Sequence, residues 1–319
     1  MMIEKMQIIK KLKHIRNLFR RIKNLFKLAN HVDDTKILLA KLLINQNIQR
    51  GLLSNIHEAE FKVFSQFGED GILQYLIRQT CISQKEKIFI EFGVENYTES
   101  NTRFLLVNDN WRGLIIDGSE DNIGQCKSSD IYWRHGLTAI NAFIESGNIN
   151  QIFSENDFLG EIGILSIDID GNDFWVWESI SVINPIIVVC EYNSVFGSKR
   201  AITVPYAPDF VRTKAHYSNL YFGCSLKALE ILAKRKGYAL VGSTSVGNNA
   251  FFVRLDRLNN IKPLSTDEAY VQSLFRESRD ENGQLTFLNG NSRADVIANM
   301  PVYDVEHKVE VLIKDVLAK

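Results

Sequence analysis

Two apolar segments of this chain each end in oxygen-bearing side chains, and these side chains are its best candidates for chemistry. Residues 162–167 lead to Asp168 and Asp170, and residues 186–190 lead to Glu191 and Asn193. Continuous Ile, Leu and Val runs of this length are typical of parallel strands that are buried on both faces. Because α/β sheets bind ligands at the carboxyl ends of their strands, we expect these four side chains to share one edge.

A second pair of segments has the features of a nucleoside site. One ends in Glu91 and Gly93, and the other ends in Asp117 about 20 residues later, where a carboxylate could hold ribose hydroxyls. The glycine-rich dinucleotide fingerprint is absent, because Gly93 is followed by Val-Glu-Asn. An acidic first turn would repel a pyrophosphate but suits a sulfonium and an amino group, which favours S-adenosylmethionine over NAD.

The elements needed to position these residues alternate between strand and helix over residues 59–256. We expect strands at 87–93, 113–118, 131–136, 162–169 and 186–193, followed by an antiparallel pair at 238–242 and 249–254 around a Gly-Asn turn. This order predicts an α/β, doubly wound, Rossmann-like sheet with right-handed crossovers.

The two ends of the chain differ from this central part. Residues 1–58 predict a basic, helical extension in two helices, with a heptad stripe in the first and basic residues on its other faces. Such a helix could lie on an anionic membrane surface, or pack on its own domain or on a second subunit. Residues 257–319 are polar and predict a partly helical tail. The stripe consists of Ile8, Leu12, Ile15, Phe19, Ile22 and Phe26.

Bulk composition limits the possible partners. The 319 residues carry a formal net charge of -1, which suggests no nucleic-acid partner for the chain as a whole. The four cysteines show neither disulfide nor zinc spacing, so we expect reduced thiols and a cytoplasmic location. If the first helix binds a membrane, the protein would be peripheral at the inner face of that membrane. Neither a signal peptide nor a spanning segment is expected.

The motifs around Glu91, Asp117, Asp168 and Glu191 together resemble class I S-adenosylmethionine-dependent methyltransferases, particularly the FkbM-like group that modifies glycans and natural products. The resemblance covers about residues 65–254 and implies a seven-stranded sheet whose last strand is antiparallel. It also implies that Glu91 and Gly93 line the methionine part of the cofactor, Asp117 the ribose, and Asp168 the amino group or a metal. The rest of the expected cofactor set is Gln66, Gly118 and Ser119.

The same resemblance suggests a divalent metal held by Asp168, Asp170, Glu191 and Asn193. Oxygen ligands of this kind suit Mg²⁺, Mn²⁺ or Ca²⁺. The alternative is that Asp170 and Asp173 cap the following helix and Asn193 satisfies a loop.

A general base would help to deprotonate an acceptor hydroxyl. His216 is our first candidate and would act with Asp168 as a catalytic residue, because imidazole titrates near working pH. It lies in a long loop that could also determine acceptor specificity. His135 is the alternative base, although its place near the third strand favours contact with adenine.

We therefore expect an S-adenosylmethionine-dependent O-methyltransferase that acts on a sugar or glycan hydroxyl, with help from a divalent metal. The rival functions are methylation of a nitrogen or of a small metabolite without metal, and a catalytically silent scaffold with the same fold.

Overall fold

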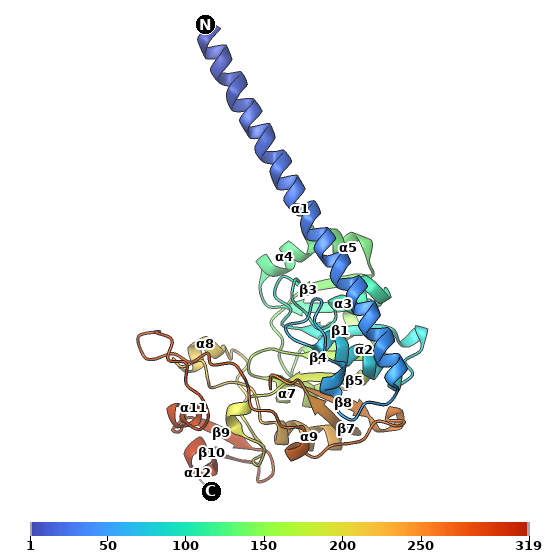
Figure 1. Cartoon of the computed structure of the whole chain (residues 1–319). Coiled ribbons are helices and arrows are strands. Elements are labelled where there is room, and N and C mark those ends of the chain that lie inside the picture. The colour runs from blue at the N-terminus through green and yellow to red at the C-terminus, as the bar shows by residue number, and fades with distance from the viewer. Residues whose placement is uncertain (1, 318–319) are drawn as a thin grey trace.

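The centre of the protein is a twisted sheet of seven strands in the order β3-β2-β1-β4-β5-β8-β7. The computed structural model describes residues 2–317, with side chains from residue 31 onward and at a few earlier positions. Strands β1 to β5 are parallel, and β8 runs antiparallel between β5 and β7 (Figure 1). The predicted doubly wound, seven-stranded sheet is confirmed. Its strands are β1 Ile88–Phe92, β2 Arg112–Asp117, β3 Leu137–Asn141, β4 Gly160–Ile167, β5 Ile183–Glu191, β7 Tyr238–Ser243 and β8 Asn249–Arg254.

Helices cover both faces of the sheet because its strands are apolar on both sides. In β1, Phe89 packs into one core and its neighbour Ile90 into the other; in β2, Ile115 and Leu114 divide in the same way. Residues of α2 Glu69–Gln79, α3 Arg103–Asp109 and α4 Glu120–Ser128 fill the first core. Residues of α6 Ile149–Glu155, α7 Asp173–Ser179 and α9 Leu226–Arg235 fill the second.

The third strand lies further along the chain than we predicted. Residues 131–136 belong mostly to a short helix, α5 Asp130–Arg134, and β3 begins only at Leu137. An Arg134–Asp130 ion pair of 2.7 Å spans the helix, and Trp133 is exposed on it. Leu137 and Ala139 supply the alternating buried positions of the strand instead.

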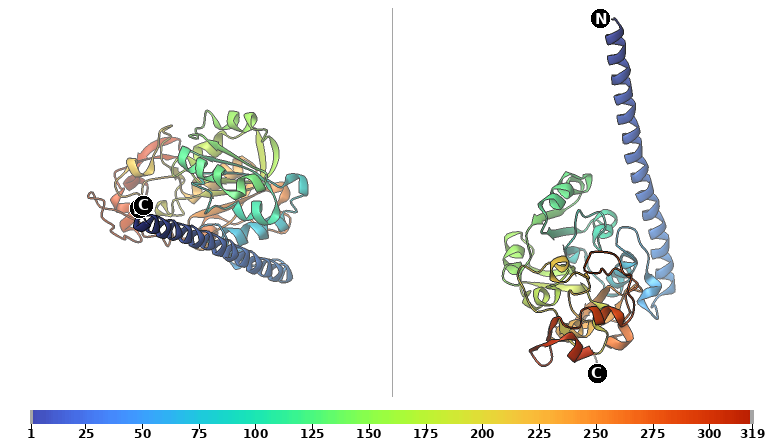
Figure 2. Two further views of the ribbon diagram at one scale, coloured as in Figure 1. Left: turned by 90° about the horizontal axis from the view of Figure 1, so that it is seen from above. Right: turned by 90° about the vertical axis from the view of Figure 1, so that its left-hand side faces the viewer.

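One long helix, α1 Met2–Arg50, replaces the two amino-terminal helices that we expected. It projects far beyond the body of the protein, and only its carboxyl-terminal part lies against it (Figure 2). The predicted heptad stripe at residues 8–26 lies outside the described side chains. None of the described helices combines the length and apolar composition that crossing a bilayer requires. The contact with the body joins Ile37, Ala40 and Ile44 to Phe61, Val63, Phe64 and Phe104.

The tail contains strands as well as the short helices that we expected. Strands β9 Pro301–Asp304 and β10 Val309–Leu312 form a small sheet with β6 Ile202–Thr203, which lies in the loop after β5. The tail also binds directly to the end of β5, where the Tyr192 hydroxyl donates to the Val271 carbonyl at 2.7 Å. Its helices are α10 Thr266–Ala269, α11 Ser292–Val296 and α12 Ile313–Leu317.

Candidate active site

A cavity of about 470 Å³ lies at the carboxyl ends of β1, β2, β4 and β5, where the sequence predicted a site. Cavities of this size accommodate small-molecule ligands in proteins. Most of the predicted site residues line it, although they come from four strands and from the segment before α2. These residues are Gln66, Glu91, Gly93, Asp117, Gly118, Asp168, Asp170 and Glu191.

Gly93 allows the turn after β1 to pass close to the end of β4. Its φ is +65°, in the left-handed region, and a Cβ placed there would lie 1.7 Å from the Asp168 carbonyl oxygen. Any side chain would therefore push the two strand ends apart. Gly93, the one glycine between β1 and α3, thus has a packing role.

Glu91 holds the loop between β1 and α3 in place. It is only 4% exposed, and its carboxylate accepts hydrogen bonds from the backbone of Asn101 at 2.8 Å and of Thr102 at 3.0 Å. The hydroxyls of Ser100 and Thr102 donate to the same carboxylate. Burial raises the pKa of Glu91, and these hydrogen bonds oppose that rise. Glu91 thus forms part of the cavity wall with most of its acceptor capacity already used.

Asp117 joins two turns at the end of β2. One carboxylate oxygen accepts from the Glu95 backbone N–H at 2.8 Å, and the other accepts from the Ser119 backbone N–H at 2.8 Å. Ser119 itself caps α4 by accepting from the Asn122 backbone N–H at 3.3 Å, and it does not line the cavity. The orientation of the Asp117 carboxylate at the cavity wall is therefore fixed. A side chain that binds ribose hydroxyls needs such a fixed orientation.

Next to Asp117 the wall is aromatic. Phe143, in the segment after β3, is exposed and lines the cavity, and a Cβ on Gly118 would lie 3.4 Å from its ring. An apolar ring beside a fixed carboxylate is a suitable surface for a nucleoside. We did not predict Phe143, because the third strand was placed too early in the sequence.

Three carboxylates meet at the ends of β4 and β5. Asp168, Asp170 and Glu191 each contribute an oxygen to a group in which all atoms lie within 4.8 Å of one another. Neither the Asp168 nor the Glu191 side chain accepts a hydrogen bond from any described residue, and Oε2 of Glu191 is buried without a partner. Burial, together with the neighbouring acids, raises the pKa of both Asp168 and Glu191 well above the usual range.

Arg212, from the loop after β5, is the cation nearest to these acids. Its guanidinium donates to Asp170 at 2.8 Å and lies over the Phe222 ring, 3.8 Å from the centroid. The sequence placed Arg212 only in a specificity loop. The structure shows that it partly neutralises the cluster and leaves Asp168 and Glu191 without a direct partner.

This donor set fits a divalent metal ion. Close carboxylates of like charge are unfavourable unless protonated or bound to a cation, and the partnerless Glu191 oxygen is a free acceptor in the same group. Carboxylate oxygens are the ligands that Mg²⁺, Mn²⁺ and Ca²⁺ prefer.

Asp173 and Asn193, which flank the cluster in sequence, hold the loops around it. Asp173 accepts from the backbone of Ile169 at 2.9 Å and of Gly171 at 3.0 Å, and burial raises its pKa to about 6. Asn193 was predicted as a metal ligand, but its amide caps the short helix that follows, at Val195. The Nδ2 of Asn193 donates to two backbone carbonyls of the later loop. These contacts agree with the alternative that we considered, in which Asn193 satisfies a loop.

Neither of the two histidines that we considered lines the large cavity. His216 lines neither of the two cavities near the cluster; its Nδ1 is within 2.8 Å of the Ser218 hydroxyl, and its ring stacks on Tyr217. His135 precedes β3 and is also absent from the cavity wall. The sequence could not show that the loop after β5 turns Arg212 toward the acids and His216 away from them.

No family model and no curated protein matches this chain. Among solved structures, the N-terminal domain of EvdMO1 with S-adenosylhomocysteine bound is similar, with a TM-score of 0.38 and 9% identity over 60% of this chain and 80% of that one. An O-methyltransferase from Bacillus cereus in complex with S-adenosylhomocysteine gives a TM-score of 0.35 and 13% identity over 67% and 88%.

Proposed function

We propose that this protein is an S-adenosylmethionine-dependent O-methyltransferase that acts on a hydroxyl of a sugar with the help of a divalent metal ion. The observation that carries this proposal is that one cavity is lined by Asp117, by Phe143 and by the cluster of Asp168, Asp170 and Glu191. Membership of the FkbM-like group remains a prediction.

The residues divide between a cofactor half and an acceptor half of the cavity. On the side of β1 and β2, Asp117 would bind the ribose hydroxyls and Phe143 would contact the base. When bound, S-adenosylmethionine supplies a methyl group on a positively charged sulfur, which an acid-lined wall favours. Gly93 permits the close approach of β1 and β4, so that the donor and the acceptor can share one space.

On the side of β4 and β5, Asp168, Asp170 and Glu191 would hold the metal ion. When bound, a divalent ion acts as a Lewis acid that lowers the pKa of a substrate hydroxyl. These residues would thereby orient a pair of neighbouring sugar hydroxyls toward the methyl donor.

In the transfer itself, the acceptor oxygen would bond to the methyl carbon while the carbon–sulfur bond of the bound cofactor breaks and leaves its electron pair on sulfur. The hydroxyl proton needs an acceptor, and His216 does not line the cavity. A carboxylate oxygen of the acid cluster that the metal leaves free would accept this proton. The acid cluster thus replaces the histidine that we first expected.

We also propose that α1 binds a partner, either a second copy of the chain or an anionic membrane surface. The helix projects from the body (Figures 1 and 2), and Leu38, Leu39 and Leu42 are more than half exposed on it. A surface of this kind on a projecting helix is typical of a contact site.

Calorimetry with S-adenosylmethionine, in buffer with and without Mg²⁺, tests the proposal. We expect the cofactor to bind in both cases and methyl transfer to a sugar panel to require the metal. Turnover that a chelator leaves unchanged would favour the metal-free rival. Absence of cofactor binding at millimolar concentration would favour the silent scaffold.

A further inference from the structure

A second, smaller cavity of about 150 Å³ adjoins the acid cluster. It shares Gln66, Glu191 and Arg212 with the first cavity, and its other walls come from the segments after β5 and β7 and from the tail. It therefore lies on the acceptor side, where a substrate held by the carboxylates would extend.

Arg293 is a buried cation in this cavity wall. It belongs to α11, only 7% of its surface is exposed, and its Nε is buried without a hydrogen-bond partner. Among residues 31–317, no side chain forms an ion pair with it. Burial and the nearby positive charge of Arg212 lower the pKa of Arg293, so the environment disfavours its charged form. A buried guanidinium normally has an anionic partner.

Apart from Glu191, which the proposed function assigns to the metal, the other charged groups around this cavity have partners of their own. Arg212 pairs with Asp170 at 2.8 Å. Glu277 is within 3.4 Å of Arg279 and accepts from the Asn219 amide at 3.2 Å. Glu191 belongs to the metal cluster. The positive charge of Arg293 is thus left for a ligand.

We propose that Arg293 binds the carboxylate of the acceptor, so that the substrate is an acidic sugar of the uronic acid type. This inference rests on the proposed function, because the sugar hydroxyls must reach the cluster of Asp168, Asp170 and Glu191. A guanidinium binds a carboxylate through two parallel hydrogen bonds.

A singly charged group fits this position better than a phosphate monoester does. The second cavity has about one third of the volume of the first, and Glu191 and Glu277 contribute to its wall. A phosphate monoester carries close to two negative charges at pH 7, and these carboxylates would repel it.

The test measures binding of D-glucuronate, D-glucose and glucose 1-phosphate to the full chain by calorimetry in Mg²⁺. We expect D-glucuronate to bind about ten- to a hundredfold more tightly than D-glucose, because a charge-assisted hydrogen-bond pair is added. Equal binding of the two sugars would overturn the inference without any variant. Tighter binding of glucose 1-phosphate would overturn the choice of a carboxylate.

Arg293→Met should reduce the affinity for D-glucuronate to that for D-glucose. The matched control is Arg276→Met, which removes an exposed charge between the cavity-lining residues Phe275 and Glu277 and should leave the affinity for D-glucuronate unchanged. D-glucuronate should raise the melting temperature of the wild type but not that of the Arg293 variant. A variant that retains full D-glucuronate affinity would refute the role of Arg293.

Binding of S-adenosylhomocysteine to the same samples separates the two proposals. If D-glucuronate binds through Arg293 but S-adenosylhomocysteine does not bind, the methyl-transfer proposal fails and the anion site stands. If S-adenosylhomocysteine binds and D-glucuronate has no advantage over D-glucose, only the acidic-sugar inference fails.

Discussion

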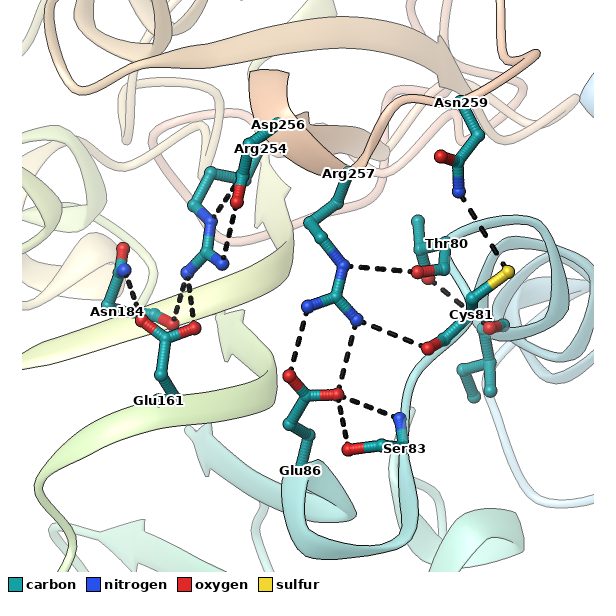
Figure 3. Close-up of polar contacts among 11 residues, drawn as sticks. Thr80, Cys81, Ser83, Glu86, Glu161, Asn184, Arg254, Asp256, Arg257 and Asn259 are labelled. Carbon is teal, nitrogen blue, oxygen red and sulfur yellow. Dashed lines mark hydrogen bonds and ion pairs between the residues drawn. The ribbon is translucent and has the colours of Figure 1, made fainter.

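Acidic side chains at the two ends of the central sheet differ in whether they have hydrogen-bond or ion-pair partners. At the amino end, Glu86 in the short helix η2 Gln84–Glu86 receives two hydrogen bonds from Arg257, at 2.9 and 3.2 Å (Figure 3). Its pKa falls to about 2, chiefly through this contact. Close by, Arg254 at the end of β8 pairs with Glu161 at 2.8 Å and with Asp256 at 2.7 Å.

At the carboxyl end, Asp168 and Glu191 accept no hydrogen bond from a described side chain or backbone, and burial raises their pKa values well above the usual range. The acids that connect elements at the amino end are therefore paired, whereas Asp168 and Glu191 are unpaired at the position where the proposed metal ion would bind. Unpaired, buried charge is costly, so it persists mainly where function requires it.

The largest effect should come from removing one unpaired acid. Glu191→Gln should reduce methyl-transfer turnover about a hundredfold, because the proposed metal ion would lose a charged ligand. Turnover is measured with saturating cofactor across a Mg²⁺ titration. Glu161→Gln, at the paired end, is the control and should retain activity. Unchanged kinetics in the Glu191 variant would remove the metal from the mechanism.

A substitution at the amino end of the sheet should change the stability of the fold. Arg257→Met should lower the free energy of unfolding by about 2 kcal/mol, because Glu86 is left buried without its cation. In the wild type, the folded pKa of Glu86 is about 2 against an ordinary 4.5, so the unfolded state binds more protons between these values. Stability should fall as the pH is lowered from about 5 to 2, and this part of the slope should be smaller in the variant. Denaturant unfolding at several pH values measures both.

Asp117→Asn should weaken binding of S-adenosylmethionine about tenfold, since ribose hydroxyls would lose a charged acceptor. One of the two backbone hydrogen bonds to this side chain could also be lost, so the melting temperature is measured beside the calorimetric affinity. Asp121→Asn, an exposed acid on α4, is the control. Full cofactor affinity in the Asp117 variant would place the ribose elsewhere.

The sequence predicted the sheet well because each buried strand has its own apolar run, as in residues 162–167 and 186–190. It failed at residues 131–136, where aromatic residues suggested a strand but Asp130 and Arg134 stabilise a helical turn. It located Asp168, Asp170 and Glu191 because the carboxyl ends of parallel strands must meet at one edge.

Side chains on long connections could not be placed in this way. His216 and Arg212 are four residues apart in one loop, yet only Arg212 reaches the cavity. Arg293 lies about 100 residues beyond β5, in a tail without recognisable motifs, and joins the site only through tertiary packing. An arginine without an acidic neighbour in the sequence would have been a signal for an anion site. Arg293 gives no such signal, because Asp295 lies two residues away.

The smallest effect on catalysis should come from the part of the chain furthest from the sheet. Deleting residues 1–30 leaves the contact of Ile37, Ala40 and Ile44 with the body intact, so turnover per active site should not change. Oligomeric state, measured by light scattering, or binding to anionic liposomes should change, because the deleted segment carries most of the basic residues of α1. A variant that matches the wild type in both measurements would show that residues 1–30 bind neither partner, whereas reduced turnover would mean that this segment contributes to the site.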